Sequence, residues 1–164
     1  AWIIRRAMAV YGADFFLFRP GLMMLFLGLG LTVPLALGPV AVGPITFSLH
    51  WMLLGLSLVV LGLQAVYLGI LSRVFYDYSG DFTERWFKRF PYDRTMIASG
   101  LTFLVGLGLD ALLVARYVSQ HFELLEISRL SHLAVTGLLL MIVSFLTFTF
   151  TLVLHSTAVA VWRK

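Results

Sequence analysis

Residues 50–73 read HWMLLGLSLVVLGLQAVYLGILSR, and the 22 residues from Trp51 to Ser72 carry no charge. At about 1.5 Å rise per residue, a helix of this length crosses a hydrocarbon layer of about 30 Å. Trp51 and Arg73 are residue types that suit the two membrane interfaces. The stretch therefore predicts a transmembrane helix, and the rest of the chain can be placed around it.

The two sides of this helix differ in chemistry. Gly55, Gly62 and Gly69 recur every seventh residue and line one side, whereas Ser57 and Gln64 share the opposite side. A glycine strip admits a close helix neighbour, and polar side chains in a membrane need hydrogen-bonding partners. We expect protein on both flanks, with these five residues serving helix packing and a polar interior. The alternative is that the glycines only reflect ordinary membrane-helix composition.

The composition indicates an integral membrane protein. The chain has 164 residues, of which 60% are hydrophobic and 12% are charged. It has no cysteine, which excludes disulfides and thiolate metal sites. The net charge is +4, but the basic residues lie beside the apolar runs, so we expect them to meet anionic lipid head groups rather than nucleic acid.

The predicted fold is all-α, with four transmembrane helices and amphipathic interfacial helices. The spans are expected over about residues 20–38, 51–72, 96–117 and 133–154, within a membrane domain of residues 19–164. Residues 1–18 form an amphipathic juxtamembrane segment that carries Arg5 and Arg6. The loop 73–94 is also amphipathic, with its aromatic and basic side chains on different sides. We assign as candidate lipid-phosphate or head-group residues Arg85, Lys88, Arg89, Arg73, Arg5 and Arg6.

The distribution of Lys and Arg predicts the orientation. Ten lie in the N-terminal segment, the middle loop and the C-terminus, and two lie in the linker between the third and fourth spans. Because positive residues concentrate on the cytoplasmic side, both termini and the loop 73–94 are expected in the cytoplasm, with the domain in the cell inner membrane.

Two short sequence patterns occur twice in the chain. Gly28-Leu29-Gly30-Leu31 recurs as Gly106-Leu107-Gly108-Leu109, and His50 before the second span matches His132 before the fourth. Two helices appearing twice would form two parallel repeats, inserted the same way up about a pseudo-twofold axis along the membrane normal. The alternative is chance matching, because few residue types build such spans.

Asp110 is the one acid well inside a predicted span, which makes it a functional candidate. From its depth it is expected to meet Ser57 and to serve as a packing hydrogen bond, with a proton or ion path as the alternative. His50 and His132 enter at similar depth, which leaves open a shared metal or tetrapyrrole. We assign no catalytic residue and no metal ligand.

Three stretches carry a family resemblance. They are FxxPG at residues 18–21, HWMLLG followed by LGLQAVYLGILSRVF, and YDRTMIASGLTFLVGLGLD. These resemble the C-terminal membrane region of polyprenyl-phosphate glycosyltransferases, family 2 enzymes similar to dolichol-phosphate mannose synthase. The fourth span departs from the pattern, because Ser144 and Thr147 stand where we expect a counterpart of Gly62 and Gln64.

The resemblance implies a function. It indicates a membrane anchor and lipid-acceptor platform of an enzyme that moves a sugar from a nucleotide sugar to a polyprenyl phosphate. In that family the catalytic domain, with its divalent metal and nucleotide sugar, precedes the membrane region, so we expect no cofactor in these residues. The expected partners are membrane lipids, including polyprenyl phosphate, and a catalytic domain or other membrane subunits. The rival hypotheses are a small accessory subunit of a larger membrane complex, and a channel or cofactor-binding subunit.

Overall fold

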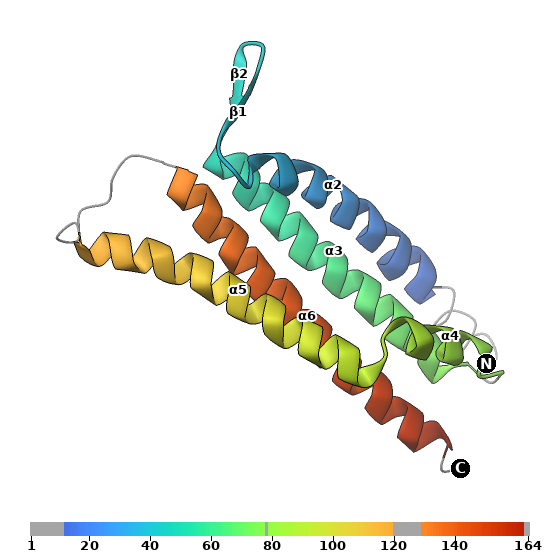
Figure 1. Ribbon diagram of the computed structural model, residues 1–164. Helices are drawn as coiled ribbons and strands as arrows, with labels where there is room; N and C mark the ends of the chain where they lie inside the picture. The colour runs from blue at the N-terminus through green and yellow to red at the C-terminus, as the bar shows by residue number, and fades with distance from the viewer. Residues whose placement is uncertain (1–11, 78, 120–128, 163–164) are drawn as a thin grey trace.

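The protein is a bundle of long helices (Figure 1). The computed structural model describes residues 12–77, 79–119 and 129–162. The short π-helix η1 (Asp14–Phe18) leads directly into α2 (Arg19–Leu35), and α3 (Leu49–Phe75), α4 (Asp81–Arg89), α5 (Tyr92–Ser119) and α6 (Arg129–Trp162) follow. Within these described ranges, four stretches are long and apolar enough to cross a membrane, namely Asp14–Leu35, Leu49–Phe75, Tyr92–Ser119 and Leu130–Thr157. The all-α fold class with four such helices is confirmed.

The helix ends differ from those expected. Because η1 continues into α2, the first apolar helix starts at Asp14 and includes the last residues of the expected surface segment 1–18. Residues 1–11, including Arg5 and Arg6, lie outside the described residues. The first helix ends at Leu35 rather than near residue 38, and each of the other three is longer than its expected span.

The first hairpin, α2 with α3, is held together by backbone contact at glycines. A Cβ built on Gly28 would lie 2.6 Å from the backbone N of Val59, and one built on Gly62 would lie 2.5 Å from the backbone N of Leu25. Such distances leave no room for a side chain, so glycine lets the two helices approach closely. Gly55 and Gly69 also face this partner segment, so the glycine side of α3 packs against η1 and α2.

The second hairpin, α5 with α6, repeats this packing at one point. A Cβ on Gly106 would lie 2.6 Å from the carbonyl O of Gly137 and 3.0 Å from the backbone N of Met141. In the first hairpin, Gly28 contacts Gly55 and Val59 in the same way. Val59 and Met141 are the same number of residues apart as His50 and His132, so they occupy equivalent positions in the two hairpins. The expected repeat is therefore visible as equivalent contacts in the two hairpins.

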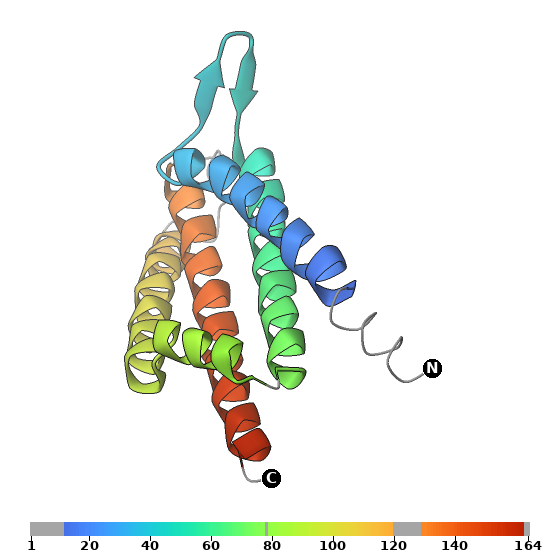
Figure 2. The same ribbon diagram turned by 90° about the vertical axis from the view of Figure 1, so that its right-hand side faces the viewer.

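The two hairpins pack through their second helices. Figures 1 and 2 show α3 and α6 side by side and running in the same direction, with α2 and α5 on the outside. This arrangement suits two hairpins inserted the same way up. The buried core lies mainly on this α3–α6 contact and includes Tyr67, Ile70, Val74, Phe150 and Leu154.

A β-hairpin projects from the end of the bundle opposite α4 (Figures 1 and 2). Strands β1 (Val40–Val42) and β2 (Ile45–Phe47) pair antiparallel around Gly43 and Pro44. Gly43 has φ +60°, a conformation that glycine adopts without steric cost. Gly-Pro is a dipeptide typical of turns, but three-residue strands are too short for their alternation to be recognised from the sequence.

Candidate functional site

The amphipathic helix α4 lies across the end of α3 and across α6 near Phe150 and His155, and it is outside the candidate spans (Figures 1 and 2). A turn that precedes it is organised by Asp77. The Asp77 carboxylate accepts hydrogen bonds from Thr83 N and Thr83 Oγ1 at 2.8 and 2.7 Å, and from Ser79 Oγ at 2.9 Å. Partial burial acts to raise the pKa of Asp77, but hydrogen bonds from Thr83, Ser79 and the backbone of Gly80 outweigh it and lower the pKa. Asp77 therefore stabilises the start of α4 in its ionised form.

One face of α4 docks on the membrane helices through aromatic rings. Phe90 lies 5.2 Å from Phe150 and 6.2 Å from Tyr67, both edge-on, and Tyr67 stacks on Phe150 at 4.1 Å between centroids. Phe87 packs against His155 at 4.8 Å. These contacts fix the position of α4 relative to α3 and α6.

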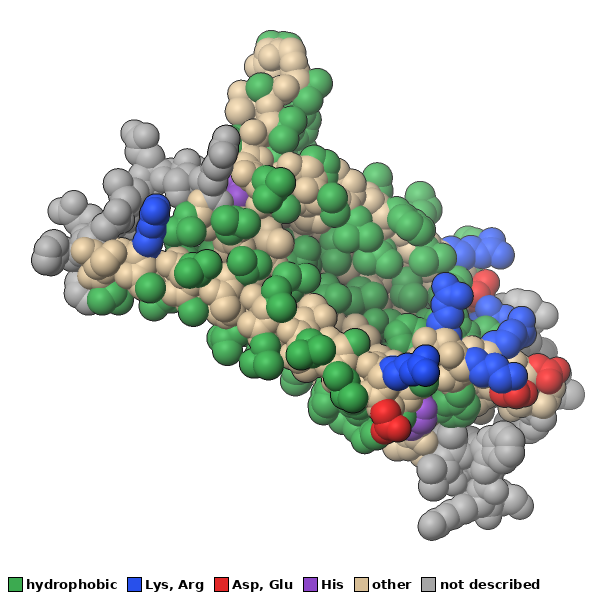
Figure 3. Space-filling view, in the orientation of Figure 1, with side chains coloured by type: hydrophobic (Ala, Val, Ile, Leu, Met, Phe, Trp, Pro, Cys, Tyr) green, Lys and Arg blue, Asp and Glu red, His purple; other side chains and the backbone are tan. Residues whose placement is uncertain are grey.

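A second face of α4 carries an aromatic and basic groove. Phe82, Arg85, Trp86 and Arg89 occur at helical spacing and line a groove of about 460 Å³. The guanidinium of Arg85 lies 5.9 Å from the centre of the Phe82 ring, and Arg85 Nε donates to the carbonyl O of Asp81 at 3.2 Å. Figure 3 shows basic side chains gathered at this end of the molecule, next to a recessed apolar surface. We call these four residues the α4 groove.

Lys88, predicted to act with Arg85 and Arg89, lies outside the α4 groove. Its ammonium is 2.7 Å from Glu84 Oε1, and both side chains are exposed. The hydrogen bond from Lys88 lowers the pKa of Glu84. The structure therefore brings together Arg85 and Arg89 but gives Lys88 an acidic partner on another side of the helix.

Arg73 connects α4 to the N-terminal helix. Its guanidinium lies 4.5 Å from the centre of the Phe82 ring and 3.1 Å from Asp14 Oδ1. Asp14 also pairs with Arg19 at 3.5 Å. Arg73, expected as a head-group residue, is thus already held by an aromatic ring and a carboxylate.

The expected polar interior differs in detail. Gly55, Gly62 and Gly69 face η1 and α2 as expected of a packing strip. Ser57 and Gln64 are both exposed, and Ser57 donates to the carbonyl O of Leu53 in its own helix. α3 meets α6 through the side that carries Tyr67 and Ile70, so Ser57 lies away from this contact. Gln64 lies at its edge, where it lines a pocket with Leu146 and Phe150 of α6.

Asp110 and the two matched histidines also have different surroundings from those expected. Asp110 is partly buried, and its Oδ1 lies next to Gly137 of α6 rather than next to Ser57. His50 is exposed, whereas His132 is fully buried with Nδ1 2.8 Å from the carbonyl O of Leu35. Among the described residues, no three His, Asp or Glu side chains cluster as a metal site.

Two contacts were missed by reasoning from sequence. Tyr67 Oη lies 2.8 Å from Thr147 Oγ1 and joins the two hairpins inside the bundle. Asp14 is the first acid of the chain, and it precedes a span by a few residues, so an ion pair with a basic residue at the same interface was a detectable signal. Tyr67 gave no such signal because it lies in an apolar run.

Comparison with known protein families matches residues 70–158 to the glycosyltransferase family 2 C-terminal transmembrane region. The matched segment contains the end of α3, the whole of α4 and α5, and most of α6. Neither the curated proteins nor the solved structures contain a match. Because the match spans more than half of the 164 residues, and four helices are suited to cross a membrane, the chain is a membrane-anchoring domain that belongs to the glycosyltransferase family 2 C-terminal transmembrane region.

Proposed function

We propose that this membrane domain is the lipid-acceptor platform of a glycosyltransferase that moves a sugar from a nucleotide sugar to a polyprenyl phosphate. The observation that carries the proposal is the α4 groove, where Arg85 and Arg89 lie on one face with Phe82 and Trp86. Guanidinium groups bind phosphate oxygens in a bidentate geometry, and aromatic rings are stable at the membrane interface. The groove therefore suits a phosphate that is carried at the end of a lipid.

The charge of each arginine supports this role. Arg89 forms no ion pair within the described ranges, and Arg85 is held only by the carbonyl O of Asp81 and the Phe82 ring. A phosphate would therefore not have to displace a carboxylate from either side chain. Lys88 would have to leave Glu84 first, which makes it the weaker candidate.

The proposed orientation places α4 and both termini in the cytoplasm, with the domain in the cell inner membrane. Ten of the 12 Lys and Arg residues fall in the segments on this side. A cytoplasmic nucleotide-sugar domain, as partner, would then meet the acceptor phosphate at the interface. The divalent metal and the nucleotide sugar would belong to that domain.

The test is phosphate binding by an arginine variant. Replacing Arg85 and Arg89 together by Ala should weaken binding of farnesyl phosphate to the detergent-solubilised protein by about tenfold, since hydrogen bonds to charged groups are worth about 1.5–3 kcal/mol. Isothermal titration calorimetry measures the change.

Lys88→Ala is the matched control, because it removes a cation from the same helix but outside the α4 groove. It should change the affinity by less than about twofold. Farnesyl phosphate binding that is unchanged in the double arginine variant would contradict the proposal.

A further inference from the structure

One polar side chain of α3 lies deep in the membrane. At about 1.5 Å rise per residue, Gln64 is about 22 Å from Leu49 and about 16 Å from Phe75, the two ends of α3. Its amide is therefore well inside a hydrocarbon core of about 30 Å. Because this core holds no water, the hydrogen bonds of the amide must come from protein.

The described residues offer the Gln64 amide no partner. Gln64 is exposed and forms no hydrogen bond within residues 12–77, 79–119 and 129–162. Thr149 of α6 lines the same pocket, but its hydroxyl donates to carbonyl oxygens of its own helix. Ser57, on the same side of α3 as Gln64, also donates within its own helix. The two N–H donors and the carbonyl acceptor of Gln64 thus need a partner from outside these residues.

Exposed leucines extend this side of α3 in a seven-residue pattern. Leu54, Leu61 and Leu68 recur every seventh residue, and all three are exposed. Ser57 and Gln64 follow the first two leucines by three residues, so the spacings alternate between three and four. This is the pattern of positions a and d in a left-handed coiled coil. We call these five residues the α3 seam, which α2 and α6 leave free because they pack against other sides of α3.

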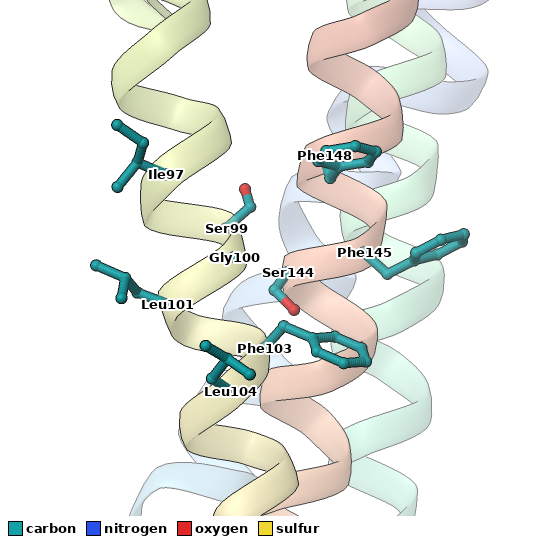
Figure 4. Close-up of a pocket in the computed structure, with 9 residues that line it drawn as sticks. All are labelled: Ile97, Ser99, Gly100, Leu101, Phe103, Leu104, Ser144, Phe145 and Phe148. Carbon is teal, nitrogen blue, oxygen red and sulfur yellow. The ribbon is translucent and has the colours of Figure 1, made fainter.

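The apolar groove between α5 and α6 differs from the α3 seam (Figure 4). Ser99 and Ser144 line it, as counterparts of Gly21 and Gly62 in the repeat described above, and its other side chains are apolar. Acyl chains of the surrounding lipid cover such a surface, so it indicates no protein partner. Acyl chains offer the Gln64 amide neither a donor nor an acceptor, so the α3 seam does indicate one.

A second copy of the chain supplies what the Gln64 amide lacks. Copies inserted the same way up are related by a twofold axis along the membrane normal, which places their α3 helices in parallel. Gln64 then lies opposite Gln64 at the same depth, and each amide donates an N–H to the carbonyl O of the other. Leu54, Leu61 and Leu68 meet their own counterparts in the same register. The amide and the leucines therefore favour one arrangement.

We propose that the protein is a homodimer whose subunits associate through the α3 seam, with the two Gln64 amides paired inside the membrane. None of the seam residues lines the α4 groove, so this proposal is independent of phosphate binding. The α3 helix is then packed on three sides, by α2, by α6 and by the α3 helix of the second copy.

The first test removes the amide. Gln64→Leu keeps an apolar side chain in the seam, but apolar side chains drive little association in lipid because acyl tails are equally apolar. The dissociation constant of the dimer should therefore rise by about tenfold, as measured by sedimentation equilibrium of the detergent-solubilised full chain. Ser57→Ala is the matched control, because Ser57 lies in the α3 seam but bonds within its own helix. It should change the constant by less than about twofold.

The second test locates the contact in cell membranes. The chain has no cysteine, so a single introduced cysteine gives an unambiguous cross-link. On oxidation with iodine, Leu61→Cys should form a disulfide-linked dimer, because facing seam positions lie within the Cα separation of about 4.4–6.8 Å that a disulfide spans. Leu107→Cys in α5 is the matched control and should stay monomeric. Leu107 is also exposed and lies about 22 Å from Tyr92, as Leu61 lies about 21 Å from Phe75.

A cross-linked Leu61→Cys dimer together with weakened association of Gln64→Leu would support the proposal. It is overturned if the full chain sediments as a monomer at all concentrations, or if Gln64→Leu leaves the dissociation constant unchanged. Cross-linking of Leu61→Cys that does not exceed that of Leu107→Cys would also overturn it. A Leu61→Cys product with the mass of the chain joined to a different protein would assign the α3 seam to that protein and reject the homodimer.

Discussion

The two hairpins have the same topology and one shared type of contact, but they are closed to different extents. In the first, Gly21, Gly28, Gly55 and Gly62 bring α2 and α3 together along most of their length. In the second, only the contact of Gly106 with Gly137 has this form, and the position equivalent to the Gly21–Gly62 contact is an apolar groove. The same type of contact therefore occurs in a closely packed hairpin and in a hairpin that contains an apolar groove.

The histidines that match in the sequence show the same divergence. His50 is exposed at the start of α3, whereas His132 is buried where the end of α2 meets the start of α6. The family match begins at residue 70 and so includes α4 and the second hairpin but little of the first.

The largest expected effect tests the closed hairpin. Gly62→Leu should destabilise the protein by about 3 kcal/mol, because its Cβ would lie 2.5 Å from a backbone atom of α2 that cannot move independently. Unfolding in mixed detergent micelles, followed by circular dichroism, measures the change in free energy.

Gly30→Leu is the control for this substitution. Gly30 lies in α2, and a Cβ built there would have no atom within 4 Å, so its stability should equal or exceed that of the unsubstituted protein. Equal losses in the two variants would show that the glycine contacts do not close the first hairpin.

A smaller effect tests the link between the hairpins. Thr147 Oγ1 donates to the carbonyl O of Val143, so in its contact with Tyr67 it accepts and Tyr67 Oη donates. Tyr67→Phe should cost about 0.6 kcal/mol, the average for hydrogen bonds between membrane helices. The ring keeps its stack on Phe150, so the measured loss reports on the hydrogen bond.

A double-mutant cycle with Thr147→Val isolates the pair. If the two substitutions are additive, the hydroxyl contact contributes nothing to the association of the hairpins, which would then depend on the apolar core and the aromatic stack.

The contrast between the hairpins also explains what the sequence could predict. Charge-free runs of membrane length and the regular spacing of Gly55, Gly62 and Gly69 predicted the helices and the glycine contacts, because both depend on local pattern. The sequence did not predict which side of α3 meets α6. That choice follows from the aromatic contacts of Tyr67 and Phe150, which lie far apart in the chain.

The candidate site was predictable to a similar extent. The basic and aromatic composition of residues 81–90 located it. The expected separation of aromatic and basic side chains onto different sides was wrong, because Phe82 and Trp86 line the α4 groove together with Arg85 and Arg89. The exclusion of Lys88 from the groove was not predictable from charge alone, because it depends on how α4 rotates when Phe87 and Phe90 dock. The groove near Ser99 and Ser144 could not be predicted from the sequence. Serine in place of glycine does not indicate whether the two helices move apart or shift along each other.

The smallest expected effect concerns α4, which connects the hairpins. The pKa of Asp77 is lower in the folded protein than the value of about 3.9 in an unfolded chain, because Thr83 and Ser79 donate to its ionised form. Its contribution to docking is thus complete above about pH 4 and is lost as the pH falls through the lower folded pKa.

In a variant with Trp86 as the single tryptophan, the fluorescence of Trp86, which stacks on Phe90, should change over this acidic range. In Asp77→Asn, α4 should be less firmly docked at neutral pH, and this transition should be absent. A transition of equal size in Asp77→Asn would assign it to another carboxylate and leave the rings of Phe87 and Phe90 as the contacts that hold α4 between the hairpins.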